Sequence, residues 1–266
     1  NDKKRSYTWR ISDNDDDEGD FINRGTLDSN RGVIYMNAGS GNVRVYHSWD
    51  SFSQSQGSLA ETFLINGLGS SATALNTSPS QVAGSTSTLF VGNDIGQLWK
   101  VLNADNPNGQ TRVNLTGDEF VGSVSDIEFG KDENHIFVTF YNYGVESIFY
   151  SSDGGENWSK KEGNLPDIPV YNILQSPLDE DEVIIGTELG VWFTNNFSSN
   201  NPNWRQANAG MKDLRVTDMD MRKGDNKVFI STYGLGIFSG TFQNSEPTFT
   251  ISTNTNYLEI LKGEKK

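Results

Sequence analysis

Residues 183–194 have the sequence VIIGTELGVWFT: a run of β-branched residues, a turn containing glycine, and a second run of β-branched and aromatic residues. Runs of this kind favour strands. Glycine supplies the positive φ that a tight turn between two strands needs. The stretch therefore predicts a β-hairpin over residues 183–194.

The same pattern returns at near-constant intervals along the chain. Its first run is centred on Ile34, Phe90, Phe137, Ile184 and Phe229, which stand 56, 47, 47 and 45 residues apart. A period of roughly 40–50 residues built from strand pattern alone is typical of the four-stranded blades of a β-propeller. We therefore predict an all-β protein, a β-propeller of four-stranded antiparallel blades with about five blade equivalents in this chain.

The repeats also suggest how the chain is divided. An outer strand and an acidic loop are expected in residues 1–19, followed by blades in residues 20–71, 72–117, 118–168, 169–210 and 211–242. The last repeat lacks a recognisable outer strand, and residues 243–266 are interpreted as an exit linker and the first strand of an immunoglobulin-like module. Two arrangements stay open: an N-terminal strand around Trp9 closes a ring of five blades, or the chain is cut from a longer propeller.

Composition limits the classes of partner. The 266 residues carry a formal net charge of −14, which disfavours nucleic acid, because phosphate binding needs a positive patch. No stretch approaches the roughly 20 apolar residues of a membrane-spanning helix, so we expect no membrane insertion. The absence of cysteine excludes disulfides but not secretion.

One motif is specific. Residues 151–158 read SSDGGENW and fit the pattern S-x-D-x-G-x-x-W through Ser151, Asp153, Gly155 and Trp158. An aspartate can accept backbone N–H bonds inside a tight turn, and Gly155 permits a φ that other residues resist. Trp158 is expected to pack between neighbouring sheets.

This motif resembles the Asp box, or bacterial neuraminidase repeat, of sialidases, sortilin-type receptors, xyloglucanases and many secreted bacterial propellers. The resemblance covers roughly residues 20–242. In that superfamily the Asp box is a structural turn away from the active face. The resemblance therefore implies a fold and a structural role for these four residues, and a fold alone does not identify a function.

Candidate catalytic residues are few. The resemblance to sialidases implies three arginines and a Phe-Arg-Ile-Pro signature, and the signature is missing here. A glycoside hydrolase needs two carboxylates across a cleft. Asp126 and Asp218 occupy equivalent positions of two predicted innermost strands, where they could line the channel as acid and base. The alternative is that both bind the backbone of the adjacent blade.

The turns between the second and third strands should form a rim on the face opposite the Asp box. Tyrosine, amide and acidic side chains there suit a glycan or peptide surface, and they suit ordinary solvated turns equally well. The candidate rim residues are Asn93, Asp94, Asn142, Tyr143, Glu188 and Tyr233.

The acidic run has aspartate at alternate positions, at Asp13, Asp15, Asp17 and Asp20. Calcium loops look similar because hard cations prefer several carboxylate oxygens. Here the glycine falls one residue late and the required glutamate is missing. A solvated acidic loop is the alternative to calcium, and no other cofactor is expected.

These observations favour a non-catalytic recognition or adhesion scaffold of a secreted bacterial protein, extracellular or on the outer cell surface, that binds glycan or protein at its rim. One alternative is a xyloglucanase-like or sialidase-like glycoside hydrolase with part of its catalytic residues outside this chain. Another is a structural subunit of a cell-surface assembly or a cargo of a secretion machinery, such as the type IX route.

Overall fold

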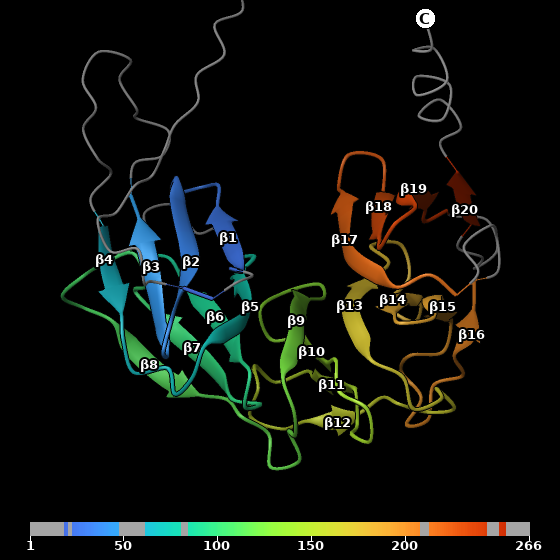
Figure 1. Ribbon diagram of the computed structural model, residues 1–266, viewed down its shortest axis with the longest axis horizontal. Coiled ribbons are helices and arrows are strands. Elements are labelled where there is room, and N and C mark those ends of the chain that lie inside the picture. The colour runs from blue at the N-terminus through green and yellow to red at the C-terminus, as the bar shows by residue number, and fades with distance from the viewer. Residues whose placement is uncertain are drawn as a thin grey trace, which may run out of the picture.

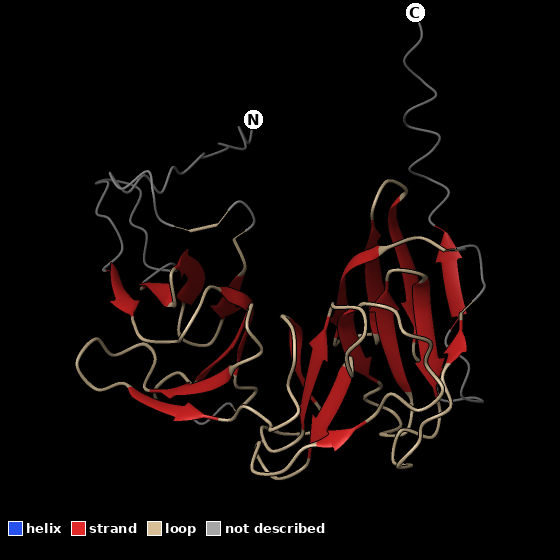
Figure 2. Ribbon diagram, turned by 60° about the horizontal axis from the view of Figure 1, so that its bottom comes forward, coloured by secondary structure: helices blue, strands red, loops and turns tan. Residues whose placement is uncertain are grey.

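The computed structural model describes residues 19–20, 23–47, 62–80, 85–207, 213–243 and 250–253. Regular structure in these residues consists of strands, and none of them form a helix that could cross a membrane (Figure 2). The strands are β1 (Gly25–Asp28), β2 (Val33–Gly39), β3 (Asn42–Tyr46), β4 (Thr62–Ile65), β5 (Ala72–Thr77), β6 (Leu89–Asn93), β7 (Leu98–Leu102), β8 (Thr111–Asn114), β9 (Val124–Phe129), β10 (Ile136–Phe140), β11 (Ile148–Ser151), β12 (Ser159–Lys160), β13 (Val170–Gln175), β14 (Val183–Thr187), β15 (Gly190–Thr194), β16 (Arg205–Gln206), β17 (Val216–Arg222), β18 (Lys227–Thr232), β19 (Gly236–Thr241) and β20 (Thr250–Thr253).

The strands form five four-stranded antiparallel sheets, and each sheet consists of four strands that follow one another in the chain. The opening stretch forms the predicted hairpin: Ile185 pairs with Trp192 across β14 and β15, and Thr187 pairs with Gly190 at the turn. Consecutive strands pair because short turns can join antiparallel neighbours directly. The prediction of four-stranded antiparallel blades is confirmed.

The fifth sheet corrects one expectation. The sequence suggested that the last repeat has no outer strand, but β20 pairs with β19, with Gly240 opposite Ile251. Part of the segment interpreted as the start of an immunoglobulin-like module is therefore the fourth strand of the last sheet. Residues 254–266 and the N-terminal strand around Trp9 lie outside the described residues, so the module and ring closure by that strand stay predictions.

The sheets are arranged side by side around a common centre, with their first strands innermost (Figure 1). Strand β1 packs beside β5, β5 beside β9, β9 beside β13, and β13 beside β17. The described sheets form an arc whose two ends, β1 and β17, stand apart in Figure 1. The innermost strands thus line one central space.

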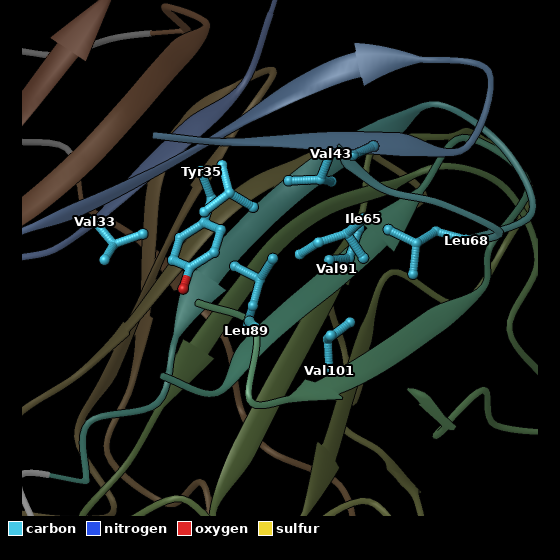
Figure 3. Close-up of a cluster of buried hydrophobic side chains, with 11 residues drawn as sticks. Val33, Tyr35, Val43, Ile65, Leu68, Leu89, Val91 and Val101 are labelled. Atoms are coloured by element: carbon cyan, nitrogen blue, oxygen red, sulfur yellow. The ribbon is translucent and has the colours of Figure 1, made fainter. Parts of the chain in front are cut away.

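The core is divided into four clusters, each shared by two successive sheets. Leu89 and Val91 of β6 pack in the cluster shared with the first sheet, whereas Phe90 packs in the cluster shared with the third. This alternation follows from the period of two in a strand, because successive side chains point to opposite faces. Figure 3 shows the first cluster, in which Tyr35 and Val43 meet residues of the second sheet.

Candidate functional site

The register separates two ends of the sheets. Ile136 pairs with both Phe129 and Ser151, so the turn from β9 to β10 and the Asp-box motif lie at the same end. We call this end the Asp-box face. The opposite end, which we call the turn face, carries the connections from second to third strands at residues 94–97, 141–147, 188–189 and 233–235.

The Asp-box motif forms the tight turn that its sequence predicts. The Asp153 carboxylate accepts hydrogen bonds from the Ser151 hydroxyl (2.7 Å), the Asn157 backbone N–H (2.9 Å) and the Asn157 side chain (2.7 Å). Gly155 has a φ of +94° and donates its N–H to Ser151 Oγ. These bonds hold the Asp153 carboxylate in its charged form and lower its pKa to about 2.

Trp158 ties the turn to the neighbouring sheet. Its indole N–H donates to the carbonyl of Leu115 at 3.0 Å, and its ring packs 5.0 Å from that of Phe120. The side chains of Ser151, Asp153 and Asn157 bond to one another within the turn. The hydrogen bonds of Ser151, Asp153 and Trp158 thus hold the turn together and join it to the neighbouring sheet.

A second copy of the same turn lies in the fourth sheet, where the sequence matches the motif poorly. Asn196 takes the place of Asp153: its Oδ1 accepts from Thr194 Oγ1 at 2.7 Å and from the Asn203 N–H at 2.9 Å. Trp204, 1% exposed, donates its indole N–H to the carbonyl of Lys161. Three extra residues between acceptor and tryptophan hide the motif from a fixed-spacing pattern.

The inner-strand aspartates are anchored to neighbouring sheets. Asp126 Oδ2 accepts the N–H of Ile173 at 3.0 Å from the next inner strand, and Asn172 Nδ2 donates to Asp218 Oδ1 at 3.3 Å. This geometry agrees with the structural alternative for Asp126. Burial raises the pKa of Asp126 to about 7, and the charge of Asp218 adds to the rise. Burial also raises the pKa of Asp218, which the positive charge of Arg24 opposes.

A third inner-strand acid, Glu128, was not predicted from the sequence. Glu128 lies two residues beyond Asp126 in β9, on the same side of the strand. Burial and then the charge of Asp126 raise the pKa of Glu128 to about 8. The alternation of Asp126 and Glu128 in an inner strand was the signal that could have revealed it.

The predicted rim residues fall into two groups. Asn93 is fully buried: its side chain donates to the carbonyl of Leu68 and accepts the N–H groups of Ile95 and Gln97, so it shapes its own turn and presents no surface. Asn142 accepts the N–H of Ser123 and is half-buried. Asp94, Tyr143 and Tyr233 are exposed on the turn face, and Glu188 is half-exposed.

A stacked cluster crosses three sheets on the turn face. The rings of Tyr141 and Tyr171 lie 6.2 Å apart with an interplanar angle of 9°. The guanidinium of Arg215 lies 4.6 Å from the centre of the Tyr171 ring. The Tyr171 hydroxyl donates to Glu188 Oε2 at 2.6 Å, and Glu188 also lies 3.7 Å from Arg215 Nε. Of these four residues, only Glu188 was predicted from the sequence to lie on the rim.

Large apolar side chains are exposed mainly at this end. Of the twelve exposed large hydrophobic residues in the described part of the chain, eight lie on the turn face. Tyr233 is 76% exposed, and Leu235 and Ile237 are both 64% exposed. The other five are Ile95, Val121, Tyr141, Tyr143 and Leu189.

Of the predicted calcium residues, Asp13, Asp15 and Asp17 lie outside the described residues. Asp20 accepts a hydrogen bond from Asn37 Nδ2 at 2.8 Å. The described ranges contain no group of three or more acidic, histidine or cysteine side chains that could hold a metal ion. Calcium binding by the acidic run stays a prediction.

Comparison with solved structures finds chains of the same architecture. The β-propeller domain of Myceliophteria thermophila Cps50 (Swd1) matches with a TM-score of 0.59 and 10% identity, over 87% of this chain and 74% of that one. The WD40 repeats of RRP9 match with a TM-score of 0.58 and 10% identity, over 82% and 62%. The GH74 xyloglucanase from Xanthomonas campestris matches with a TM-score of 0.54 and 12% identity, over 84% and 36%.

This chain has the β-propeller fold. At identities this low the similarity concerns the fold alone. The chain spans 62% of the RRP9 structure and about a third of the xyloglucanase. No protein-family model matches the sequence, and no curated protein matches it either.

Proposed function

We propose that this propeller is a non-catalytic recognition scaffold that binds a protein partner on its turn face. The observation that carries the proposal is the concentration of exposed apolar side chains there. Three of these residues, Tyr233, Leu235 and Ile237, lie within one hairpin, and exposed apolar side chains grouped on a soluble protein mark interaction sites. Tyrosine and arginine, which form the Tyr141–Tyr171–Arg215 stack, are the residue types enriched in the energetic centres of protein interfaces.

A protein is favoured over a glycan by the aliphatic members of the surface. Tyrosine rings can stack on sugars as well as on protein groups, but Ile95, Leu235 and Ile237 offer neither an aromatic face nor a hydrogen bond to a hydroxyl. The exposed Asp94 adds negative charge, whereas Glu188 is paired with Arg215. The expected partner segment is therefore apolar with a basic residue beside it. An extracellular or cell-surface location is part of the same proposal and rests on the resemblance to secreted Asp-box propellers.

The proposal is tested with a displayed library of random peptides selected on the purified chain. Enriched peptides are then titrated against the wild type, the turn-face variant Leu235→Ser/Ile237→Ser, and the control Val113→Ser/Leu178→Ser. The control changes two apolar residues that are exposed away from the turn face. We expect at least a tenfold loss for the turn-face variant, or roughly 1.4 kcal/mol, and none for the control.

Equal binding to the wild type and the turn-face variant would overturn the proposal. So would a selection that enriches no peptide. If the chain binds a glycan on an array and a Tyr143 variant does not, the partner on this face is a glycan and not a protein.

A second candidate function rests on the inner-strand acids. A carboxyl with a pKa of about 7 beside a second carboxylate is the pattern of a general acid in glycoside hydrolysis, and the GH74 xyloglucanase has a similar fold. Against it, Asp126 is engaged by the backbone N–H groups of Ile127 and Ile173. We expect the chain to release no reducing sugar from xyloglucan. Release that disappears in Asp126→Asn and Asp218→Asn would favour the hydrolase.

A further inference from the structure

A cavity of about 570 Å³ lies at the Asp-box face, at the far ends of the innermost strands. All five sheets contribute to its wall, for example through Leu27 of β1, Asn76 of β5, Glu128 of β9, Gln175 of β13 and Met221 of β17. Its volume falls within the range of small-molecule sites, about 300–1,000 Å³. Because the cavity opens opposite the turn face, a ligand here would not compete with a partner there.

The polar groups of the wall are mostly neutral. Side-chain amides come from Asn30, Asn76, Gln175 and Asn226, and hydroxyls from Ser29 and Ser78. Asn76, Gln175 and Ser78 donate to Ile127, Glu180 and Glu133 within the protein, so the amides of Asn30 and Asn226 and the hydroxyl of Ser29 are the groups open to a ligand. Amides and hydroxyls both donate and accept hydrogen bonds. Such a wall can match a ligand that itself presents donors and acceptors in alternation.

Most charges of the wall are neutralised by partners within the protein. Lys131 pairs with Glu180 at 3.2 Å, and Asp28 pairs with Arg31 at 2.9 Å. The groups that act electrostatically on Glu128 are Asp126 and Asp220, which oppose its ionisation, and Lys223, which favours it. Because the pKa of Glu128 is raised to about 8, its carboxyl holds a proton at neutral pH and can donate as well as accept.

Apolar groups complete the wall. Leu27 is 49% exposed although its neighbour Asp28 in β1 is buried, and Leu174 and Met221 also reach the cavity. A ligand with C–H surface on one face and hydroxyls around its edge would contact both the apolar and the polar groups of the wall. A strongly charged ligand would find little unpaired charge to meet it.

We propose that this cavity binds a small neutral saccharide. The inference concerns a site, a face and a ligand class different from those of the proposed function.

The proposal is tested by saturation-transfer NMR and calorimetry with glucose, galactose, N-acetylglucosamine, cellobiose and maltose. Leu27→Trp should fill the cavity, and Lys223→Trp should narrow it from the fifth sheet. Leu178→Trp is the matched control, since Leu178 is 40% exposed and does not line the cavity. We expect at least one sugar to bind the wild type and the control equally, and both cavity variants to bind it at least tenfold more weakly.

Three results would overturn the proposal: no sugar of the panel binds, a cavity variant that keeps the wild-type circular dichroism and melting temperature still binds, or inorganic phosphate displaces the sugar. Leu235→Ser/Ile237→Ser should leave sugar binding unchanged. Its loss of peptide binding with sugar binding intact separates the two proposals.

Discussion

The Asp153 side chain shows how one residue can hold a turn. It accepts three hydrogen bonds within seven residues of chain, two of them from Asn157. In the fourth sheet Asn196 accepts two corresponding hydrogen bonds through its single amide oxygen. The turn therefore needs an acceptor at this position and gains from a charged one, since bonds to a charged acceptor are stronger.

We expect Asp153→Ala to lower the melting temperature at pH 7, and Asp153→Asn to lower it less, because asparagine keeps one acceptor as Asn196 does. The pKa of Asp153 is lower in the folded chain than its ordinary value of 3.8. Its stabilising effect is therefore present above pH 4 and is lost as the pH falls toward 2. Thermal melts between pH 2 and pH 7 should show the gap between wild type and Asp153→Ala narrowing on the acid side.

The exposed Asp94, on the turn face, is the control for this series. Asp94→Ala should melt close to the wild type throughout. A gap for Asp153→Ala that stays constant from pH 7 to pH 2 would contradict the account of a charged acceptor.

At the scale of elements, tryptophans fasten two of the outer strands, β12 and β16, to the sheet before each of them. Trp204 donates its indole N–H to Lys161 at 2.9 Å, and its backbone exchanges two hydrogen bonds with the side chain of Asn164. Lys161 in turn donates its ammonium to the carbonyls of Phe197 and Ser199. The third and fourth sheets are thus joined by a closed set of polar contacts around a buried ring.

Trp204→Ala should reduce the free energy of unfolding by about 3–5 kcal/mol, the usual cost of removing a buried aromatic side chain. Trp204→Phe keeps most of the ring but leaves the carbonyl of Lys161 without its donor, so we expect a loss of about 1–3 kcal/mol. Urea denaturation measures both. Trp192→Ala, at a half-buried tryptophan of the same sheet, should cost clearly less; an equal cost would show that the link between sheets is not special.

The elements were predictable where both faces of a strand are buried. Runs such as Ile136-Phe137-Val138 are apolar throughout because alternate side chains fill two different clusters. Strand β20 was missed because residues 242–249 separate it from its partner β19 and its composition did not distinguish it from a strand of another module. Pairing, which decides the matter, is not visible in a single run of residues.

The candidate site was harder to predict for a related reason. Asn93 and Tyr143 occupy comparable turns, yet the first is buried by hydrogen bonds to its own turn and the second is 63% exposed. Tyr171 and Arg215 lie at or just before the starts of inner strands, and only the assembly of neighbouring sheets brings them together. Sequence spacing places a residue on a turn, whereas its exposure depends on the next sheet.

At the scale of the whole molecule, the radial arrangement creates two ends with different chemistry. The turn face is apolar and aromatic, and the cavity on the Asp-box face is polar and nearly neutral in charge. The fold separates the two ends by the length of the inner strands. It can therefore hold two ligands of different classes on one rigid framework.

The acids along the inner strands make the stability of the whole molecule depend on pH. Folding raises the pKa of Glu128 to about 8 from an ordinary value of 4.5, so the folded chain retains a proton that the unfolded chain has lost. The free energy of unfolding should therefore fall as the pH rises from about 5 to 8. Asp126, with a pKa of about 7, adds to the same trend.

In Glu128→Gln the side chain at position 128 no longer titrates, so it no longer contributes to the pH dependence of stability. Near pH 4 the variant and the wild type should be equally stable, because the glutamate is neutral in both states. By pH 8 the variant should be more stable by on the order of 2 kcal/mol, since each unit of pKa shift corresponds to about 1.4 kcal/mol and water reaches part of this side chain. Urea denaturation at pH 4, 6 and 8 gives the comparison, with the exposed Glu156→Gln as control. A Glu128→Gln variant that is less stable than the wild type at pH 8 would mean that the carboxylate is charged in the fold.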